Sequence, residues 1–146
     1  MIRLLRENEL ASALKLIWKV FLEYEAPDYS EQGVKTFQMY IEESAMIQRV
    51  DQGEMKFWGA FESGELAGVI GVKHGKHISM LFVDPAYHRK GIATALVAQA
   101  FADYQGTITV NSSPFAIPFY HRIGFQNQAN EQVIDGIRFT PMKMEK

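Results

Sequence analysis

The chain has 146 residues, with 15 Lys plus Arg against 17 Asp plus Glu, 4 His and no cysteine, so its formal net charge is −2. This length predicts one domain, residues 1–146, which buries a core without disulfides or metals. The lack of cysteine excludes disulfides, thiolate metal sites and a catalytic cysteine. The balanced charge disfavours broad electrostatic binding of nucleic acid.

The amino-terminal residues are polar, and no part of the chain has the run of about 18 apolar residues that spans a membrane. These features predict a cytoplasmic protein that binds neither a membrane nor nucleic acid. They leave open whether the protein forms a homodimer. The histidines at positions 74, 77, 88 and 121 lack the spacing of metal ligands on one helix, so we expect no metal.

Hydrophobic periodicity predicts a strand and two helices in the first third of the chain. After a short strand at residues 2–5, apolar residues recur at helical spacing from Glu7 to about Tyr24. Residues 26–30 break this helix, and Ser30 is placed to cap the next one. The apolar stripe of this second helix comprises Val34, Phe37, Ile41 and Ala45, with Met46 beside it.

Alternating apolar residues then predict an antiparallel meander of three strands, at residues 56–61, 66–72 and 77–83. Helical spacing returns after Asp84-Pro85 and ends at Gly106.

The rest of the chain is predicted to hold a strand at residues 107–110, a short helix around 115–123 and two further strands around Asp135-Gly136. The order is therefore β-α-α-β-β-β-α-β-α-β-β, with a parallel crossover through the long helix. The fold class is α+β, or mixed α/β, with helices on one mixed, mostly antiparallel sheet.

The most informative segment, residues 83–94, joins a strand end to a helix start. The first N–H groups of a helix have no intrahelical partner, and the helix dipole favours an anion there. Gly91 leaves room for a ligand beside the backbone, and Arg89 and Lys90 add positive charge. The segment suits a pyrophosphate, and an ordinary charged loop before a surface helix is the alternative. Neither the motif of nucleotide triphosphatases nor that of dinucleotide folds is present.

This loop resembles the signature R/Q-x-x-G-x-G/A of the GNAT superfamily of acetyl-CoA-dependent N-acetyltransferases. It reads His88-Arg89-Lys90-Gly91-Ile92-Ala93 and follows a strand that ends in Val83-Asp84-Pro85. His88 departs from the signature, which has Arg or Gln there, but the family's loop binds mainly through backbone N–H groups. A second segment, residues 111–125, resembles the family's second cofactor segment, which ends in F-Y-x-x-x-G-F. With the order of elements, the resemblance covers essentially the whole chain.

The resemblance implies a GNAT fold and direct acetyl transfer from acetyl-CoA to a primary amine of a small molecule or a protein. The lack of cysteine agrees with transfer without an acyl-enzyme. Tyr120 matches the family's tyrosine general acid, since a phenol with a pKa of about 10 is protonated at neutral pH. The implied cofactor contacts are Leu81, Phe82, Val83, His88, Arg89, Lys90, Gly91, Ile92, Ala93, Thr94, Asn111, Ala116, Phe119 and Tyr120.

No general base is identified from the sequence. Carboxylates lie where the first two helices meet, a region that borders the acceptor cleft in relatives, and they attract a cationic amine. The candidates for the acceptor side are Glu23, Tyr24, Glu25, Asp28, Tyr29 and His77. The alternative is that these side chains have no role in binding and are solvated at the surface or packed in the core. The alternative function is a non-catalytic acyl-CoA-binding or interaction module with the same fold.

Overall fold

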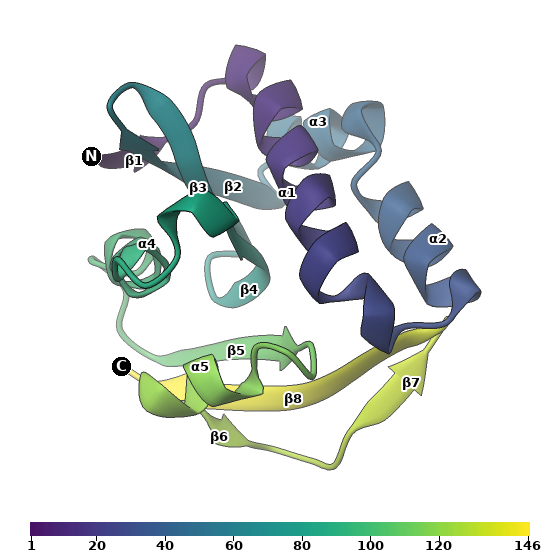
Figure 1. Cartoon of the computed structure of the whole chain (residues 1–146). Coiled ribbons are helices and arrows are strands. Elements are labelled where there is room, and N and C mark those ends of the chain that lie inside the picture. Colours follow the sequence, from purple (N-terminus) through teal and green to yellow (C-terminus); the bar gives the residue numbers. More distant parts are fainter.

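Eight strands form one sheet in the computed structural model, which describes residues 1–146 (Figure 1). The strands are β1 Ile2–Leu4, β2 Met55–Glu62, β3 Glu65–Lys73, β4 His77–Val83, β5 Thr107–Ser112, β6 Gln126–Asn127, β7 Gln132–Ile134 and β8 Ile137–Glu145. Their order is β1-β2-β3-β4-β5-β8-β6, with β7 paired to β8. Only β4 and β5 pair in parallel. The mixed, mostly antiparallel sheet is confirmed; the short β6 was not predicted.

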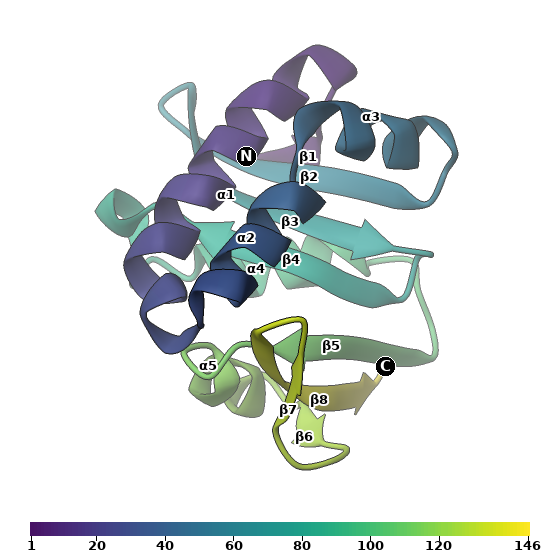
Figure 2. The ribbon, with the colours of Figure 1, turned by 90° about the vertical axis from the view of Figure 1, so that its right-hand side faces the viewer.

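Helices cover both faces of this sheet. The helices are α1 Leu10–Tyr24, α2 Glu31–Tyr40, α3 Glu43–Asp51, α4 Ile92–Ala100 and α5 Ile117–Arg122. In Figure 2 the first three helices lie in front of the sheet and α4 lies behind it. None of them is both long and apolar enough to cross a bilayer.

The predicted second helix is divided into α2 and α3. Between them lies Glu42, whose carboxylate accepts hydrogen bonds from the amides of Ser44 and Ala45 at 3.2 and 3.0 Å. This side-chain cap starts a new helix, so the prediction of one continuous helix was wrong here. Ile41 and Met46 are buried nevertheless, because both helices keep their apolar side toward the sheet.

Two hydrophobic clusters pack on opposite faces of the sheet, and β4 contributes to both. Met80 belongs to the cluster under α1, whereas Ile78 belongs to the cluster under α4. Residues two apart on a regular strand share a face. A β-bulge separates these two, because Gly71 pairs with Met80 while Val72 pairs with Ile78, which leaves Ser79 unpaired. The predicted alternation along this strand did not include the bulge.

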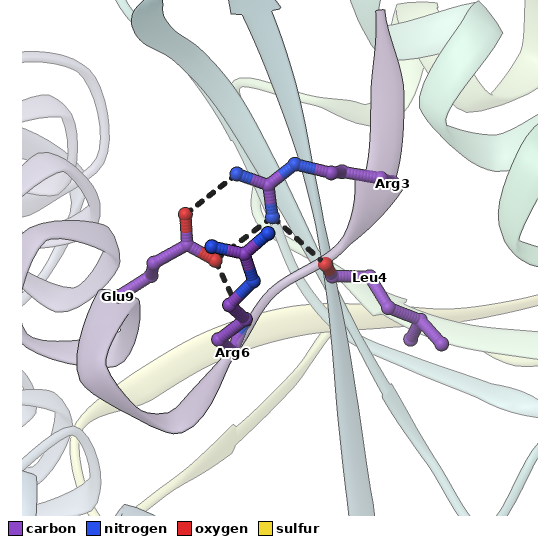
Figure 3. Close-up of polar contacts among 4 residues, drawn as sticks. All are labelled: Arg3, Leu4, Arg6 and Glu9. Atoms are coloured by element: carbon purple, nitrogen blue, oxygen red, sulfur yellow. Dashed lines mark hydrogen bonds and ion pairs between the residues drawn. The ribbon is translucent and has the colours of Figure 1, made fainter.

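An ion pair fastens the amino-terminal strand to the start of the helical layer (Figure 3). Arg3 donates to both carboxylate oxygens of Glu9 at 2.9 and 2.7 Å, and the Arg6 amide donates to Glu9 at 2.7 Å. The hydrogen bond from Arg3, followed by that from Arg6, lowers the pKa of Glu9 to about 2. Glu9 therefore stays charged at neutral pH and holds the turn before α1 against β1.

The tip of the β7–β8 hairpin rests on the start of α2 (Figure 1). Asp135 and Gly136 form this tip with φ angles of 51° and 80°, as a two-residue type I′ turn requires. Gly136 lies so close to Gly33 that a β-carbon on Gly33 would overlap the Gly136 carbonyl oxygen. The Thr36 hydroxyl donates to the Asp135 carbonyl at 2.7 Å. Glycine at position 33 thus permits a direct backbone contact between hairpin and helix.

Replacing Gly33 with Ala is expected to lower the free energy of unfolding by about 1–3 kcal/mol, because the methyl group displaces the hairpin. In an unobstructed helix the same change raises the free energy of unfolding by roughly 0.5–1 kcal/mol. The sign of the measured change therefore shows whether Gly33 contacts the hairpin. Denaturant unfolding measures the change, with the exposed neighbour Gln32→Ala as control. A more stable Gly33→Ala protein would contradict this packing.

Candidate functional site

β4 and β5 separate after a short parallel pairing. Only His77 with Thr109 and Ile78 with Val110 are paired, although both strands continue beyond them. On the side that faces β5, the backbone of residues 79–83 has no partner strand (Figure 2). Free N–H and C=O groups along such an edge bind an extended ligand as an added strand would.

α4 begins beside this free edge without a side-chain cap. Its N-cap residue, Gly91, has a φ of 73°, and a β-carbon built on it would meet nothing within 4 Å. The amides of Ile92, Ala93 and Thr94 therefore face open space at the positive end of the helix dipole. Arg89 is exposed in the same loop and adds a cation. This arrangement has the charge and the room that a pyrophosphate needs.

His88, which departs from the family signature, ties the loop to the end of β4. Its Nε2 lies 2.8 Å from the Val83 carbonyl oxygen, and because a carbonyl only accepts, Nε2 carries the proton. The ring packs against Tyr24 at a centroid distance of 5.3 Å, and Tyr24 packs against Phe115 at 5.1 Å. His88 therefore shapes the loop through its side chain, and the neighbouring backbone is left to bind a ligand.

A cavity of about 900 Å³, named here the cofactor cavity, lies between the β4 edge, the loop and α5. All but two of the predicted cofactor residues line it: Leu81, Phe82, Val83, His88, Arg89, Gly91, Ile92, Ala93, Thr94, Ala116, Phe119 and Tyr120. The Nζ of Lys90 lies 5.6 Å from the centre of the Tyr87 ring, and Asn111 lines the neighbouring cavity. Arg122 adds a second guanidinium group that was not predicted; it occupies a variable position of F-Y-x-x-x-G-F.

A second cavity of about 390 Å³, named here the acceptor cavity, lies between α2, β4, β5 and the β7–β8 hairpin. The two cavities adjoin at the end of β4, because five residues line both. These residues are Glu25, Leu81, Phe82, Ala116 and Tyr120. A ligand along the β4 edge and a second ligand in the acceptor cavity therefore approach each other beside Glu25 and Tyr120.

Tyr120 presents a protonated hydroxyl at this junction. The residue is 4% exposed, and its ring packs edge-on against Phe119 and Phe125, with centroid distances of 5.1 and 5.3 Å. No fully buried side-chain polar atom lacks a hydrogen-bond partner, so the Tyr120 hydroxyl, which bonds to no protein group, reaches the cavities. Burial raises the pKa of this phenol, and the charge of Glu25 raises it further.

Glu25 brings a carboxyl group to the same junction, at the carboxyl-terminal end of α1. Burial raises its pKa to about 7, the charge of Asp28 adds to this rise, and the side chain of Ser113 opposes it. A carboxyl group with a pKa near neutrality exchanges protons readily at physiological pH. Glu25 was one of several acidic candidates in the sequence, and the structure places it between the two cavities.

The other predicted acceptor residues are dispersed. Tyr29 lines the acceptor cavity and Tyr24 lines the cofactor cavity. Three residues line neither: Glu23, Asp28 and His77. His77 lies at the far end of β4 with Nδ1 2.8 Å from the Thr109 hydroxyl, and burial, aided by Lys73 and His74, lowers its pKa.

The hairpin wall of the acceptor cavity was not predicted. Asp135, Ile137 and Phe139 contribute to it. The Asp135-Gly136 pair indicates a hairpin in the sequence, but no local pattern shows that the hairpin folds back onto α2. No group of three or more His, Asp or Glu side chains is arranged to hold a metal ion.

The chain matches the family model described as an acetyltransferase (GNAT) domain over residues 25–146. It is 33% identical over 106 residues to YafP, an uncharacterized N-acetyltransferase of Escherichia coli K12, and this match covers 72% of the chain and 67% of the relative. The protein therefore belongs to the GNAT acetyltransferase family, which confirms the resemblance seen in its sequence.

Solved structures share the fold. A GCN5-related N-acetyltransferase from Rhodopseudomonas palustris has a TM-score of 0.83 at 23% identity, covering 100% of this chain and 95% of its own. The PaiA N-acetyltransferase of Thermoplasma acidophilum, solved in complex with coenzyme A, has a TM-score of 0.78 at 20% identity, covering 100% of this chain and 98% of its own. Likeness at these identities shows the fold, and it confirms the predicted fold class.

The anion site at α4 is tested by Gly91→Glu, which should weaken acetyl-CoA binding at least about a hundredfold, or roughly 2.7 kcal/mol, because the new carboxylate faces the pyrophosphate. Calorimetric titration with acetyl-CoA measures the loss. Gly53→Glu is a matched control, since Gly53 has a φ of 76° and an equally open surrounding, remote from both cavities. Unchanged affinity in Gly91→Glu would rule out this site.

Proposed function

We propose that the protein is an acetyl-CoA-dependent N-acetyltransferase that transfers the acetyl group directly to a primary amine of a small molecule or a protein. The junction of the two cavities carries this proposal, because an acid and a base meet there at the end of a free strand edge. Family membership supports acyl transfer, and the geometry supports the roles of individual residues.

The cofactor side binds through backbone groups. The first amides of α4 hold the pyrophosphate, with Arg89 and Arg122 at the rim, and residues 81–83 pair with the pantetheine arm as an added strand would. Asn111 contacts the arm from the end of β5. Acetyl-CoA supplies an activated thioester, and a free amide of residues 81–83 stabilises the negative charge that develops on its oxygen.

Glu25 acts as the general base for the acceptor. A primary amine is mostly protonated at neutral pH and must lose a proton before it attacks a thioester. With a pKa of about 7, a substantial fraction of Glu25 is ionised at neutral pH, and the group accepts this proton directly or through one water molecule. The negative charge also favours the entry of a cationic amine.

Tyr120 acts as the general acid for the departing thiolate. Its raised pKa keeps the phenol protonated at neutral pH, so the hydroxyl is available to donate a hydrogen bond, and its proton, to the negative charge that develops on the departing sulfur. Close packing against Phe119 and Phe125 fixes the ring, so the hydroxyl keeps its direction.

Tyr120→Phe is expected to lower kcat by about a hundredfold or more and to leave acetyl-CoA affinity nearly unchanged, because only the proton donor is removed. Steady-state rates of free-CoA release measure kcat, and calorimetry measures affinity. Tyr104→Phe is the control, since the Tyr104 hydroxyl donates to the Thr107 carbonyl at 2.9 Å and lies outside both cavities. Equal kcat values for Tyr120→Phe and the wild type across the pH range would show that Tyr120 is not the general acid.

Glu25→Gln is expected to lower kcat/KM by about 10²–10⁴-fold and to abolish the limb that rises with pH through the pKa of Glu25. In the wild type this limb should lie near pH 7, because the base works only when ionised. Rates across pH measure the limb, and Glu23→Gln, exposed on the same helix, is the control.

A second measurement checks the pKa itself. The folded protein keeps the Glu25 proton at pH values above 4.5, the ordinary pKa of a glutamate, so the stability of the wild type should fall as pH rises from 4.5 to about 7. Glu25→Gln removes this fall. If kcat/KM of Glu25→Gln still rises with pH near pH 7, another group is the general base.

A further inference from the structure

We propose that the acceptor is a small primary amine on an aromatic or other apolar body that carries no carboxylate or phosphate. This inference rests on the proposed function and names the acceptor class for the acceptor cavity. Three features of the cavity carry it: the charge of its lining side chains, the aromatic rings in its walls and the hairpin that forms one of those walls.

The walls of the acceptor cavity contain acids and no base. Glu25 and Asp135 are its charged lining residues. Arg138, a cation of the same hairpin, is engaged outside, where it pairs with Glu131 at 3.1 Å and donates to the Asp28 carbonyl at 3.1 Å. A carboxylate or phosphate on the acceptor would therefore be desolvated without a cationic partner and repelled by the two acids, whereas an ammonium group is attracted.

Arg49 contacts Tyr40 but does not line the cavity. Its guanidinium group lies 4.2 Å from the centre of the Tyr40 ring, and its Nη1 donates to the Tyr40 carbonyl at 2.7 Å. The Tyr40 hydroxyl lies 2.8 Å from Ser79 Oγ, so these two polar groups already bind each other. Neither guanidinium group in this region is free to bind an anion in the cavity.

The rest of the lining is predominantly apolar and rich in aromatic rings. The rings belong to Tyr29, Phe37, Tyr40, Phe82, Tyr120 and Phe139. Such a wall favours an aromatic or aliphatic body through burial and ring packing. It disfavours further ammonium groups along the body, because Glu25 and Asp135 are the acidic side chains available to pair with them, so a monoamine fits better than a polyamine.

The β7–β8 hairpin limits the size of the acceptor. Its tip touches the backbone of α2 at Gly33, and the Thr36–Asp135 and Arg138–Asp28 hydrogen bonds hold it there. A protein acceptor needs an open groove for the chain on both sides of its amine, and the hairpin, which forms one wall of the cavity, leaves less room for such a chain. The cavity volume of about 390 Å³ is of the order that holds a small molecule.

Matched ligands test the inference by binding, so the result does not depend on turnover. Tyramine and tyrosine, and phenethylamine and phenylalanine, differ only in the α-carboxylate and are titrated into the protein saturated with CoA. We expect each amine to bind at least about tenfold more tightly than its amino acid. Equal or tighter binding of the amino acids, or tighter binding of spermidine or a lysine peptide than of tyramine, would overturn the inference.

Asp135→Asn localises the effect to the hairpin. Asn tolerates the positive φ of this turn, so the variant removes charge and keeps shape. It should weaken tyramine binding about two- to fivefold and reduce the ratio between the affinities for tyramine and for tyrosine. Asp103→Asn is the control, because Asp103 is exposed and lies outside both cavities; it should change neither quantity. An unchanged affinity ratio in Asp135→Asn would contradict the proposal that Asp135 repels the carboxylate of tyrosine.

Free-CoA release with the same amines separates the two proposals. Tyramine that binds with the expected preference but is not acetylated would contradict the proposed function and support only the class of ligand that the acceptor cavity binds. Acetylation of amino acids in preference to the matched amines would support the proposed function and overturn the inference.

Discussion

The organisation of this protein depends on a parallel pairing that stops after two residue pairs. Beyond Ile78 and Val110, β4 and β5 diverge, and each strand is stabilised from its other side, β4 by β3 and β5 by β8. Backbone groups that would have paired across the sheet are thereby left free inside the molecule. In an ordinary sheet such an edge favours aggregation, but here the loop before α4 and the helix α5 flank it, so it forms the wall of a cavity.

The bulge at Ser79 makes this divergence compatible with a continuous core. By shifting the alternation of β4, it directs Ile78 into the cluster shared with β5 and Met80 into the cluster under α1. One strand is thus anchored in both hydrophobic clusters, on opposite faces. The free edge is therefore rigid, as a surface that positions a reacting thioester must be.

Most residues that line the cofactor cavity could be predicted from the sequence to lie together because their signals are local. Gly91 needs a positive φ, the amides after it belong to one helix start, and Tyr120 lies in the second segment, so short windows identify them. The order of elements followed from periodicity for the same reason. The break at Glu42 was missed because a glutamate cap resembles an ordinary exposed position on a helix.

The acceptor side could not be predicted to the same depth. Glu25 resembles Glu23 in sequence, and only the tertiary structure shows that one lies between two cavities and the other in solvent. The contact of Gly33 with Gly136 depends on two segments about a hundred residues apart, and no local pattern encodes it. His88 was recognised in the sequence as a departure from the family signature, but its role was not. The structure supplies that role, because the His88 side chain bonds to the Val83 carbonyl and holds the loop against the end of β4.

The hairpin contacts also have a consequence for motion. The hydrogen bonds that hold the hairpin wall of the acceptor cavity join residues 99 and 110 positions apart, whereas the bond between His88 and Val83 that holds the cofactor loop joins residues five positions apart. Contacts between distant segments require the largest loops to close, so the hairpin docks late in folding. A few hydrogen bonds hold it, so local unfolding there is less unfavourable than in the core. Lifting of the hairpin tip would therefore open the acceptor cavity while the cofactor cavity stays intact.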